Sequence, residues 1–411
     1  AVISNTAEEC DGCNNRATGT ISIKDDNTSS EIYGMYNSSE NNIYNSFSFG
    51  TGQGATKNGS DGSIIITKSE TSSGNIIGMQ GGKNLYNAYA NTSDGVNTNV
   101  RAVGKINITH NGYGDVIGIR GTNSAGKINN ALAYLNSAVS DAVAEGSIVL
   151  SGKGNVYGIY GNGTIANSET QFNKNYNMLK DFSSHGVIDV TTRSDTAAAY
   201  GIYAAGAKDT KTSVYNAMGY NSTGDIKVRN TSGGSAFGIY SAAQTYTGDD
   251  DVVYYNNTYN AFRSSAIYGD SVATGNIDMT IEGYSSLGQQ VAGIYAAGNA
   301  FNSYANSGSD VMLETIGNIT INDKSETGNM NLRGIESNGA TIANAYSTGQ
   351  NQNTATKVTG NINVNILATK NGLSTASGIF SDSINPQGTK IYNAALVNDK
   401  NNVEGNITVN A

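Results

Sequence analysis

The chain has 411 residues, of which 37% are hydrophobic and only 14% charged, with 51 glycines and a single proline, Pro386. The net charge of −9, without any cluster of Lys or Arg, argues against nucleic acid or an anionic membrane surface as a partner. No apolar window reaches the roughly 18 residues that a membrane-spanning helix needs. The low charge also argues against a charge-driven disordered chain, and the near absence of proline suits uninterrupted β-ladders.

The first segment, residues 1–18, precedes any repeat. It begins Ala-Val-Ile-Ser without methionine, which suggests removal of a signal peptide and an extracellular or cell-surface location; an artificial start is the alternative. Cys10 and Cys13 form a CxxC with no second CxxC and no histidine nearby. We predict an N-terminal cap in which a disulfide joins these two cysteines, rather than a redox or metal site.

From residue 19 onward three short phrases recur in a fixed order. The first, Gly-x-Ile-x-aliphatic, occurs ten times at spacings of 38 to 51 residues, as in GKINI at 104–108. The second is Gly-Ile or Gly-Met, 12 to 18 residues later, and the third centres on an Asn followed by Ala or Ser. Each phrase is too short for a helix, its apolar residues alternate, and Asn/Gly/Ser/Thr/Asp stretches separate it from the next.

Three strands and three turns per unit predict an all-β fold, a parallel β-helix of nine to ten coils of about 43 residues. Residues 19–411 would form one solenoid domain, with loops protruding at 168–185 and 241–274. A β-propeller is the nearest alternative, but a blade needs four antiparallel strands. A disordered low-complexity chain is a further alternative, against which the constant order of the phrases argues.

Each phrase has an expected role. In the first, aliphatics such as Ile106 and Ile108 should point inward, and the leading Gly should allow either a positive φ or close stacking. In the third, one asparagine per coil should stack into an inward ladder of side-chain amides. These asparagines are Asn45, Asn87, Asn130, Asn167, Asn216, Asn260, Asn302, Asn344 and Asn393.

The residue after Gly-Ile should face solvent, and it is aromatic in six of nine repeats. The six are Tyr36, Tyr160, Tyr203, Tyr240, Tyr295 and Phe380. A column of such rings could bind a sugar or a partner protein. The alternative is stacking between coils that only stabilises the sheet.

Candidate catalytic groups are sparse. The two histidines, His110 and His185, fall in different repeats, where we expect solvated turn residues. Acidic and basic residues do not recur at equivalent positions, so we predict no enzyme, no cofactor and no metal site. Asp249, Asp250 and Asp251 could bind Ca²⁺ weakly but lack the spacing of a calcium loop, which favours a solvated loop.

The segments AAAYGIYAAG (197–206), VAGIYAAG (291–298) and GNVYGIYGNGTIANS (154–168) resemble the passenger repeats of bacterial type V autotransporters and related surface adhesins. The resemblance covers residues 19–411 and implies a right-handed β-helix on the outside of Gram-negative cells. The units here are longer than is usual for such repeats, which implies expanded loops.

We therefore expect a non-catalytic extracellular protein, an adhesive or structural passenger whose partner is a host or bacterial surface glycan or protein. An alternative is a filament subunit, because the chain stops within a first phrase, at Asn406, Ile407, Thr408 and Val409. Such an incomplete coil could accept the N-terminal region of another copy, although truncation or cleavage would also explain it. A glycan-active enzyme using Asp249–Asp251 is the third alternative.

Overall fold

The computed structural model describes most of the chain. The described residues are 2–10, 15–26, 29–39, 41–51, 56–93, 95, 97–122, 126–137, 140–172, 181–205, 213–242, 244–245, 253–254, 257–264, 271–284, 288–307, 313–326, 330–349, 356–367, 374–382, 388–396 and 402–410. Among these residues there is no helix, and strands are joined by short turns.

Three parallel sheets make up the fold. Sheet A contains β1 (Val2–Cys10), β4 (Asn42–Gly50), β7 (Leu85–Thr92), β10 (Lys127–Leu135), β13 (Thr164–Phe172), β16 (Ser213–Met218), β21 (Asn257–Ser264), β24 (Ala300–Ser307), β27 (Thr341–Gly349) and β30 (Lys390–Leu396). Sheet B contains β2 (Arg16–Asp25), β5 (Thr56–Lys68), β8 (Thr98–His110), β11 (Asp141–Gly152), β14 (Phe182–Thr192), β17 (Ser222–Asn230), β22 (Ser271–Ile281), β25 (Leu313–Asp323), β28 (Lys357–Ile366) and β31 (Asn402–Asn410). Sheet C contains β3 (Ile32–Asn37), β6 (Ile76–Gly81), β9 (Val116–Gly121), β12 (Val156–Gly161), β15 (Ala199–Ala204), β18 (Ala236–Ser241), β23 (Gln289–Ala296), β26 (Met330–Ser337) and β29 (Thr375–Phe380).

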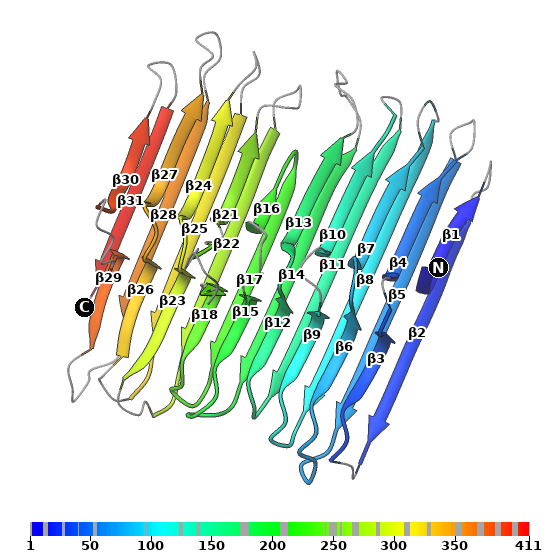
Figure 1. Cartoon of the computed structure of the whole chain (residues 1–411), viewed down its shortest axis with the longest axis horizontal. Helices are drawn as coiled ribbons and strands as arrows, with labels where there is room; N and C mark the ends of the chain where they lie inside the picture. Colours follow the sequence, from blue (N-terminus) through cyan, green and yellow to red (C-terminus); the bar gives the residue numbers. More distant parts are fainter. Residues whose placement is uncertain are drawn as a thin grey trace.

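The chain passes from sheet A to sheet B to sheet C and then returns to sheet A one step further along. We number these coils from 1 (β1, β2, β3) to 10 (β30, β31), and Figure 1 shows their strands side by side from the N-terminal to the C-terminal end. Two further strands, β19 (Gln244–Thr245) and β20 (Val253–Tyr254), form an antiparallel pair. The predicted parallel β-helix with three strands per coil is confirmed.

Domain boundaries differ from the expected ones in detail. Residues 2–10 form β1, which pairs in parallel with β4, and β2 already begins at Arg16, so the expected boundary of a cap at residue 18 lies inside a strand. The Cys10 side chain and Cys13 lie outside the described residues. Strand β13 continues to Phe172 and β14 begins at Phe182, so the segment between them is shorter than the expected loop 168–185. In the same way β21 occupies 257–264 within the expected loop 241–274.

The core lies between sheet B and the other two sheets. The inward aliphatics of the first phrase are buried, as Ile106 and Ile108 are in β8, and they pack in one continuous cluster with the aliphatics of sheets A and C. The glycine of the second phrase sits directly over this cluster. A Cβ on Gly238 would lie only 2.4 Å from Cγ2 of Ile277, so sheet C approaches sheet B too closely for any side chain there.

The glycine of the first phrase is required for a different reason. Gly224 does not have a positive φ, but a Cβ added to it would lie 2.1 Å from the backbone carbonyl oxygen of Asn216. Of the two explanations expected from the sequence, close stacking therefore applies and a left-handed corner does not. The glycine lets sheet B pass directly against the asparagine column of sheet A.

That asparagine column runs through all ten coils. The Nδ2 of each asparagine donates to Oδ1 of the next one at 2.8 to 3.0 Å, and also to the carbonyl oxygen of the first-phrase glycine in its own coil at 2.7 to 3.2 Å. All nine asparagines named from the sequence belong to it, and Asn5 in β1 is an additional member. The ladder satisfies buried amides and fixes the register of successive coils.

Candidate binding site

The predicted aromatic face is a column on the outside of sheet C. Tyr160, Tyr203, Tyr240 and Tyr295 stack in succession, with ring centroids 5.1, 4.9 and 4.7 Å apart and rings within 8° of parallel. The register places Tyr36 and Phe380 in the same column, but Gln80 and Arg120 separate Tyr36 from the stack and Glu336 separates Phe380. The six predicted residues therefore lie in one column, which is interrupted between Tyr36 and Tyr160 and again between Tyr295 and Phe380.

Stacking leaves little of these rings for a ligand. Each interior ring has a neighbouring ring on both faces, so only its edge and hydroxyl group meet solvent. A second column, Tyr157, Tyr200 and Phe237, packs beside the first in the same way. Burial raises the pKa of Tyr200 to about 12, so its hydroxyl stays protonated. This geometry favours the structural alternative, in which the column stabilises the sheet.

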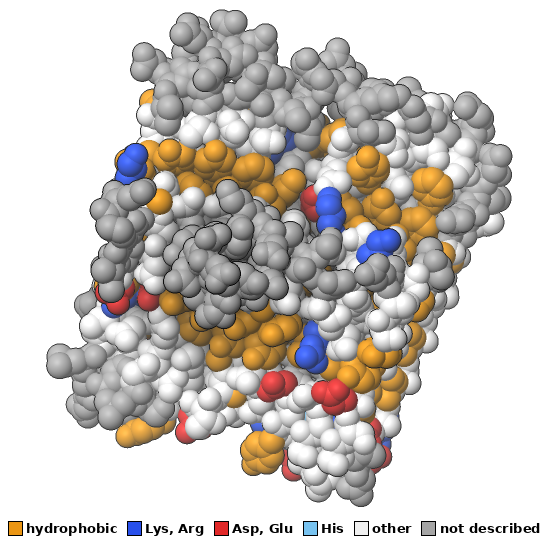
Figure 2. Space-filling model, in the orientation of Figure 1, with side chains coloured by type: hydrophobic (Ala, Val, Ile, Leu, Met, Phe, Trp, Pro, Cys, Tyr) orange, Lys and Arg blue, Asp and Glu red, His pale blue; other side chains and the backbone are white. Residues whose placement is uncertain are grey.

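Sheet A carries aromatic columns that the sequence reading missed. The outer face bears two columns whose rings stack between coils, and Figure 2 shows hydrophobic side chains gathered over the strands of sheets A and C. Their members include Tyr44, Phe47, Tyr86, Tyr89, Tyr215, Tyr259, Phe262, Phe301, Tyr304 and Tyr346. The signal was a Tyr-Asn pair in several third phrases, where the tyrosine directly precedes the ladder asparagine.

A groove crosses the turns that lead from sheet B to sheet C in coils 3 to 7. These turns occupy residues 111–115, 153–155, 193–198 and 231–235 in coils 3 to 6, and residues 282–284 contribute in coil 7, so the shortest turn lies between two longer ones. The uneven lengths leave a hollow of about 840 Å³ that is open to solvent. Repeated strands thus carry turns of different length, and this difference creates the groove.

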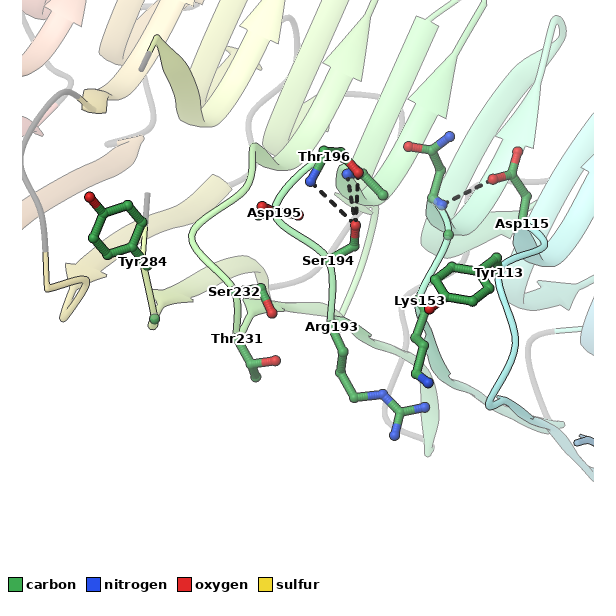
Figure 3. Close-up of a pocket in the computed structure, with 14 residues that line it drawn as sticks. Tyr113, Asp115, Lys153, Arg193, Ser194, Asp195, Thr196, Thr231, Ser232 and Tyr284 are labelled. Atoms are coloured by element: carbon green, nitrogen blue, oxygen red, sulfur yellow. Dashed lines mark hydrogen bonds between the residues drawn. The ribbon is translucent and has the colours of Figure 1, made fainter. Parts of the chain in front are cut away.

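Two tyrosines flank the groove (Figure 3). Tyr113 in coil 3 and Tyr284 in coil 7 are 75% and 68% exposed, and neither forms a ring pair with another described residue. The ammonium group of Lys153 lies 5.5 Å from the centroid of the Tyr113 ring. These rings differ from the stacked columns because no other described ring lies on their faces, although the Lys153 ammonium group lies over one face of Tyr113.

Polar side chains occupy the middle of the groove. Arg193 reaches back across the short turn of coil 4, and its Nη2 donates to the backbone oxygen of His110 at 3.3 Å and to Oδ1 of Asn111 at 3.2 Å. Asp115 accepts from the backbone nitrogen of Asn155 at 3.0 Å. These bonds link the turns of three successive coils, so the groove is held in shape.

Buried polar side chains at the end of sheet B anchor the same turns from inside. His110 is fully buried, contrary to the expected solvated turn residue: its Nδ1 accepts from the backbone nitrogen of Gly112 at 3.0 Å, and its Nε2 lies 3.0 Å from the Gly74 oxygen. Burial lowers the pKa of His110, so the ring is neutral at pH 7. The hydroxyl group of Thr192, two coils further on, donates to the backbone oxygen of Gly154 in the coil between at 3.0 Å.

His185 lies elsewhere, on the outer face of sheet B. Its Nε2 is 2.8 Å from a carboxylate oxygen of Asp225, which raises the pKa of His185 and lowers that of Asp225. The two histidines thus have different roles: His110 supports a turn from inside, whereas His185 pairs with an acid on an exposed surface. Within the described ranges no group of three His, Cys, Asp or Glu side chains is arranged to hold a metal ion.

One buried cation was not foreseen. Arg263 in β21 is fully buried, its guanidinium lies 5.7 Å from the Tyr220 ring centroid, and no nitrogen of that group has a hydrogen-bond partner among the described residues. Burial lowers the pKa of Arg263 to about 10. Its interior position on sheet A is taken by Ala305 in the next coil.

The remaining predicted residues can be placed briefly. Asn406, Ile407, Thr408 and Val409 lie in β31 and pair with Asn361 to Val364 of β28; a role in assembly stays a prediction. Asp249, Asp250 and Asp251 lie outside the described residues. No helix in the described part of the chain is long and apolar enough to cross a membrane.

Comparison of the chain with protein-family models, with curated proteins and with solved structures gives no match. The functional argument therefore rests on the geometry above.

Proposed function

We propose that this chain is a non-catalytic surface protein, an adhesive or structural passenger that works outside the cell. The observation that supports this best is the continuity of the asparagine ladder. The ladder runs through all ten coils, and interrupted aromatic columns add stacking contacts on the outer faces, so each coil is bonded to the next.

Such an arrangement suits a stiff support. In a solenoid each coil contacts only its neighbours, so length is gained without a larger core, and the turns are held at fixed positions along the rod. Ligand contacts are commonly made by loops on a rigid scaffold. Several turns from sheet B to sheet C are anchored in this way, because buried side chains such as His110 and Thr192 bond to them from inside.

Two measurements test this proposal. Antibodies against the chain should label intact cells of the organism that encodes it, and deletion of the gene should reduce attachment of those cells to surfaces. Labelling that requires permeabilised cells would contradict the external location. The purified chain should release no reducing ends from a panel of polysaccharides; turnover would contradict the non-catalytic role.

A further inference from the structure

We propose that the groove across the turns of coils 3 to 7 binds a linear, neutral oligosaccharide, with Tyr113 and Tyr284 as stacking platforms near its two ends. This inference concerns one site and does not depend on where the protein is displayed. It differs from the binding role expected for the sheet C column, where the interior rings Tyr203 and Tyr240 are covered on both faces by other rings.

The first argument is the accessibility of ring faces. A sugar ring packs its C–H groups on the face of an aromatic ring, so a receptor needs rings that are not already stacked. Tyr113 and Tyr284 are both about two-thirds or more exposed and have no ring partner among the described residues. Exposing two large aromatic side chains at one groove has an energetic cost that ligand contact would offset.

The second argument is the balance of charge and hydrogen-bonding groups between the tyrosines. Asp115 and Asp195 supply acceptors, whereas Lys153 and Arg193 supply donors, and none of the four forms an ion pair with another described residue. Sugar hydroxyl groups both donate and accept, so they can use both kinds of side chain. Two acids facing two bases give no net charge, which favours a neutral ligand over an anionic or cationic one.

The third argument is length. Tyr113 and Tyr284 are four coils apart, which at about 4.8 Å per step is roughly 19 Å along the rod. A single sugar ring cannot touch both platforms, whereas an extended chain of several rings can. Because Arg193, His110 and Thr192 hold the turns of coils 3 to 5, little ordering of that part of the groove is needed on binding.

Isothermal titration calorimetry on the full chain tests the proposal with cellotetraose, chitotetraose and maltotetraose as neutral probes and tetragalacturonate as the charged comparison. We expect at least one neutral tetrasaccharide to bind, and to bind more tightly than its own monosaccharide and than tetragalacturonate. Tyr113→Ala and Tyr284→Ala should each weaken that binding by about five-fold or more, since stacking contacts are worth roughly 1 kcal/mol each.

The matched control is Tyr36→Ala, which removes a half-exposed tyrosine of sheet C in coil 1 that does not line the groove, and should leave affinity unchanged. All three side chains are exposed, so circular dichroism and thermal melts should show that the variants fold. Failure of all three neutral probes to bind would overturn the proposal. Equal affinity of the wild type and the Tyr113→Ala, Tyr284→Ala double variant would overturn it as well.

Discussion

Breaking the asparagine ladder in its middle should destabilise the protein far more than breaking it at an exposed rung. Asn216 lies in coil 6, where its Nδ2 donates to the oxygen of Gly224 and to Oδ1 of Asn260, both at 2.8 Å. Its Oδ1 accepts from Nδ2 of Asn167 at 2.9 Å. Asn216→Ala removes all of these bonds inside a region that water does not reach.

The expected loss in the free energy of unfolding follows from the polar groups that Asn216→Ala leaves without a bond to residue 216. Asn260 would lose the donor to its buried Oδ1, and the oxygens of Gly224 and Asn276 would each lose a side-chain donor. Nδ2 of Asn167 keeps the oxygens of Gly186 and Asp225 as acceptors. At roughly 1–3 kcal/mol for the unsatisfied Oδ1 and roughly 0.5–1.5 kcal/mol for each of the two lost bonds to backbone oxygens, the free energy of unfolding should fall by about 2–6 kcal/mol. Asn393 is the matched control, because it belongs to the same ladder but is exposed. Asn393→Ala should cost less than about 1 kcal/mol, because water can replace its bonds.

Urea unfolding followed by far-UV circular dichroism measures both variants. Because a solenoid can unfold in parts, hydrogen exchange should be recorded too, and it should show reduced protection in the coils on either side of Asn216. Equal losses for the two variants, or a loss below about 1 kcal/mol for Asn216→Ala, would refute the reasoning.

Other single changes give further predictions. Gly224→Ala places a Cβ 2.1 Å from a backbone oxygen and should cost at least about 1 kcal/mol in urea unfolding, whereas Gly82→Ala, with no atom nearer than 3.6 Å, should not destabilise; equal effects would contradict this. The lowered pKa of His110 means that its contribution is present above the unfolded value of about 6.5 and is lost as the pH falls, so thermal melts of His110→Gln should show a weaker acid dependence than wild type. The raised pKa of His185 has the opposite sign, so the stability gap between wild type and His185→Gln should be full below about pH 6.5 and shrink as the pH rises; a constant gap would count against the ion pair. Arg263→Met should leave stability unchanged or raise it by about 1 kcal/mol or more, because it removes a buried charge; a clear loss would show that the guanidinium has a partner.

The repeated phrases were enough to predict the fold. The recurrence of Gly, Ile and Asn in the same order in each unit indicates positions that stack on one another, and the inward direction of Ile106 and Ile108 follows from the two-residue period of a strand. The first strand of coil 1 was missed because Asn5 stands in Ser-Asn-Thr, without the small apolar residue that follows most ladder asparagines. Its place in the column becomes visible only through the pairing of β1 with β4.

The groove could not be predicted in the same way. The groove depends on the relative lengths of neighbouring turns, and the sequences of the turns do not repeat from one unit to the next. His110 illustrates the difficulty. It directly precedes a glycine-rich turn in the sequence, which predicts a solvated side chain, but its ring lies under that turn and is buried. Likewise, the repeated phrases do not predict that Tyr113 and Tyr284 are 75% and 68% exposed and form no ring pair with another described residue.

The register of successive coils is the central claim, and disulfide trapping tests it most directly. In a background with Cys10→Ser and Cys13→Ser, cysteines would be introduced at outward positions of sheet B, where Asn107 in β8 pairs with Val149 in β11 and with Ile65 in β5. Asn107→Cys with Val149→Cys should cross-link under mild oxidation, because paired strands lie about 4.8 Å apart, within disulfide reach. Ile65→Cys with Val149→Cys spans two coils, roughly 9.6 Å, and should not. Cross-linking of the second pair but not the first would contradict the register and with it the β-helix described above.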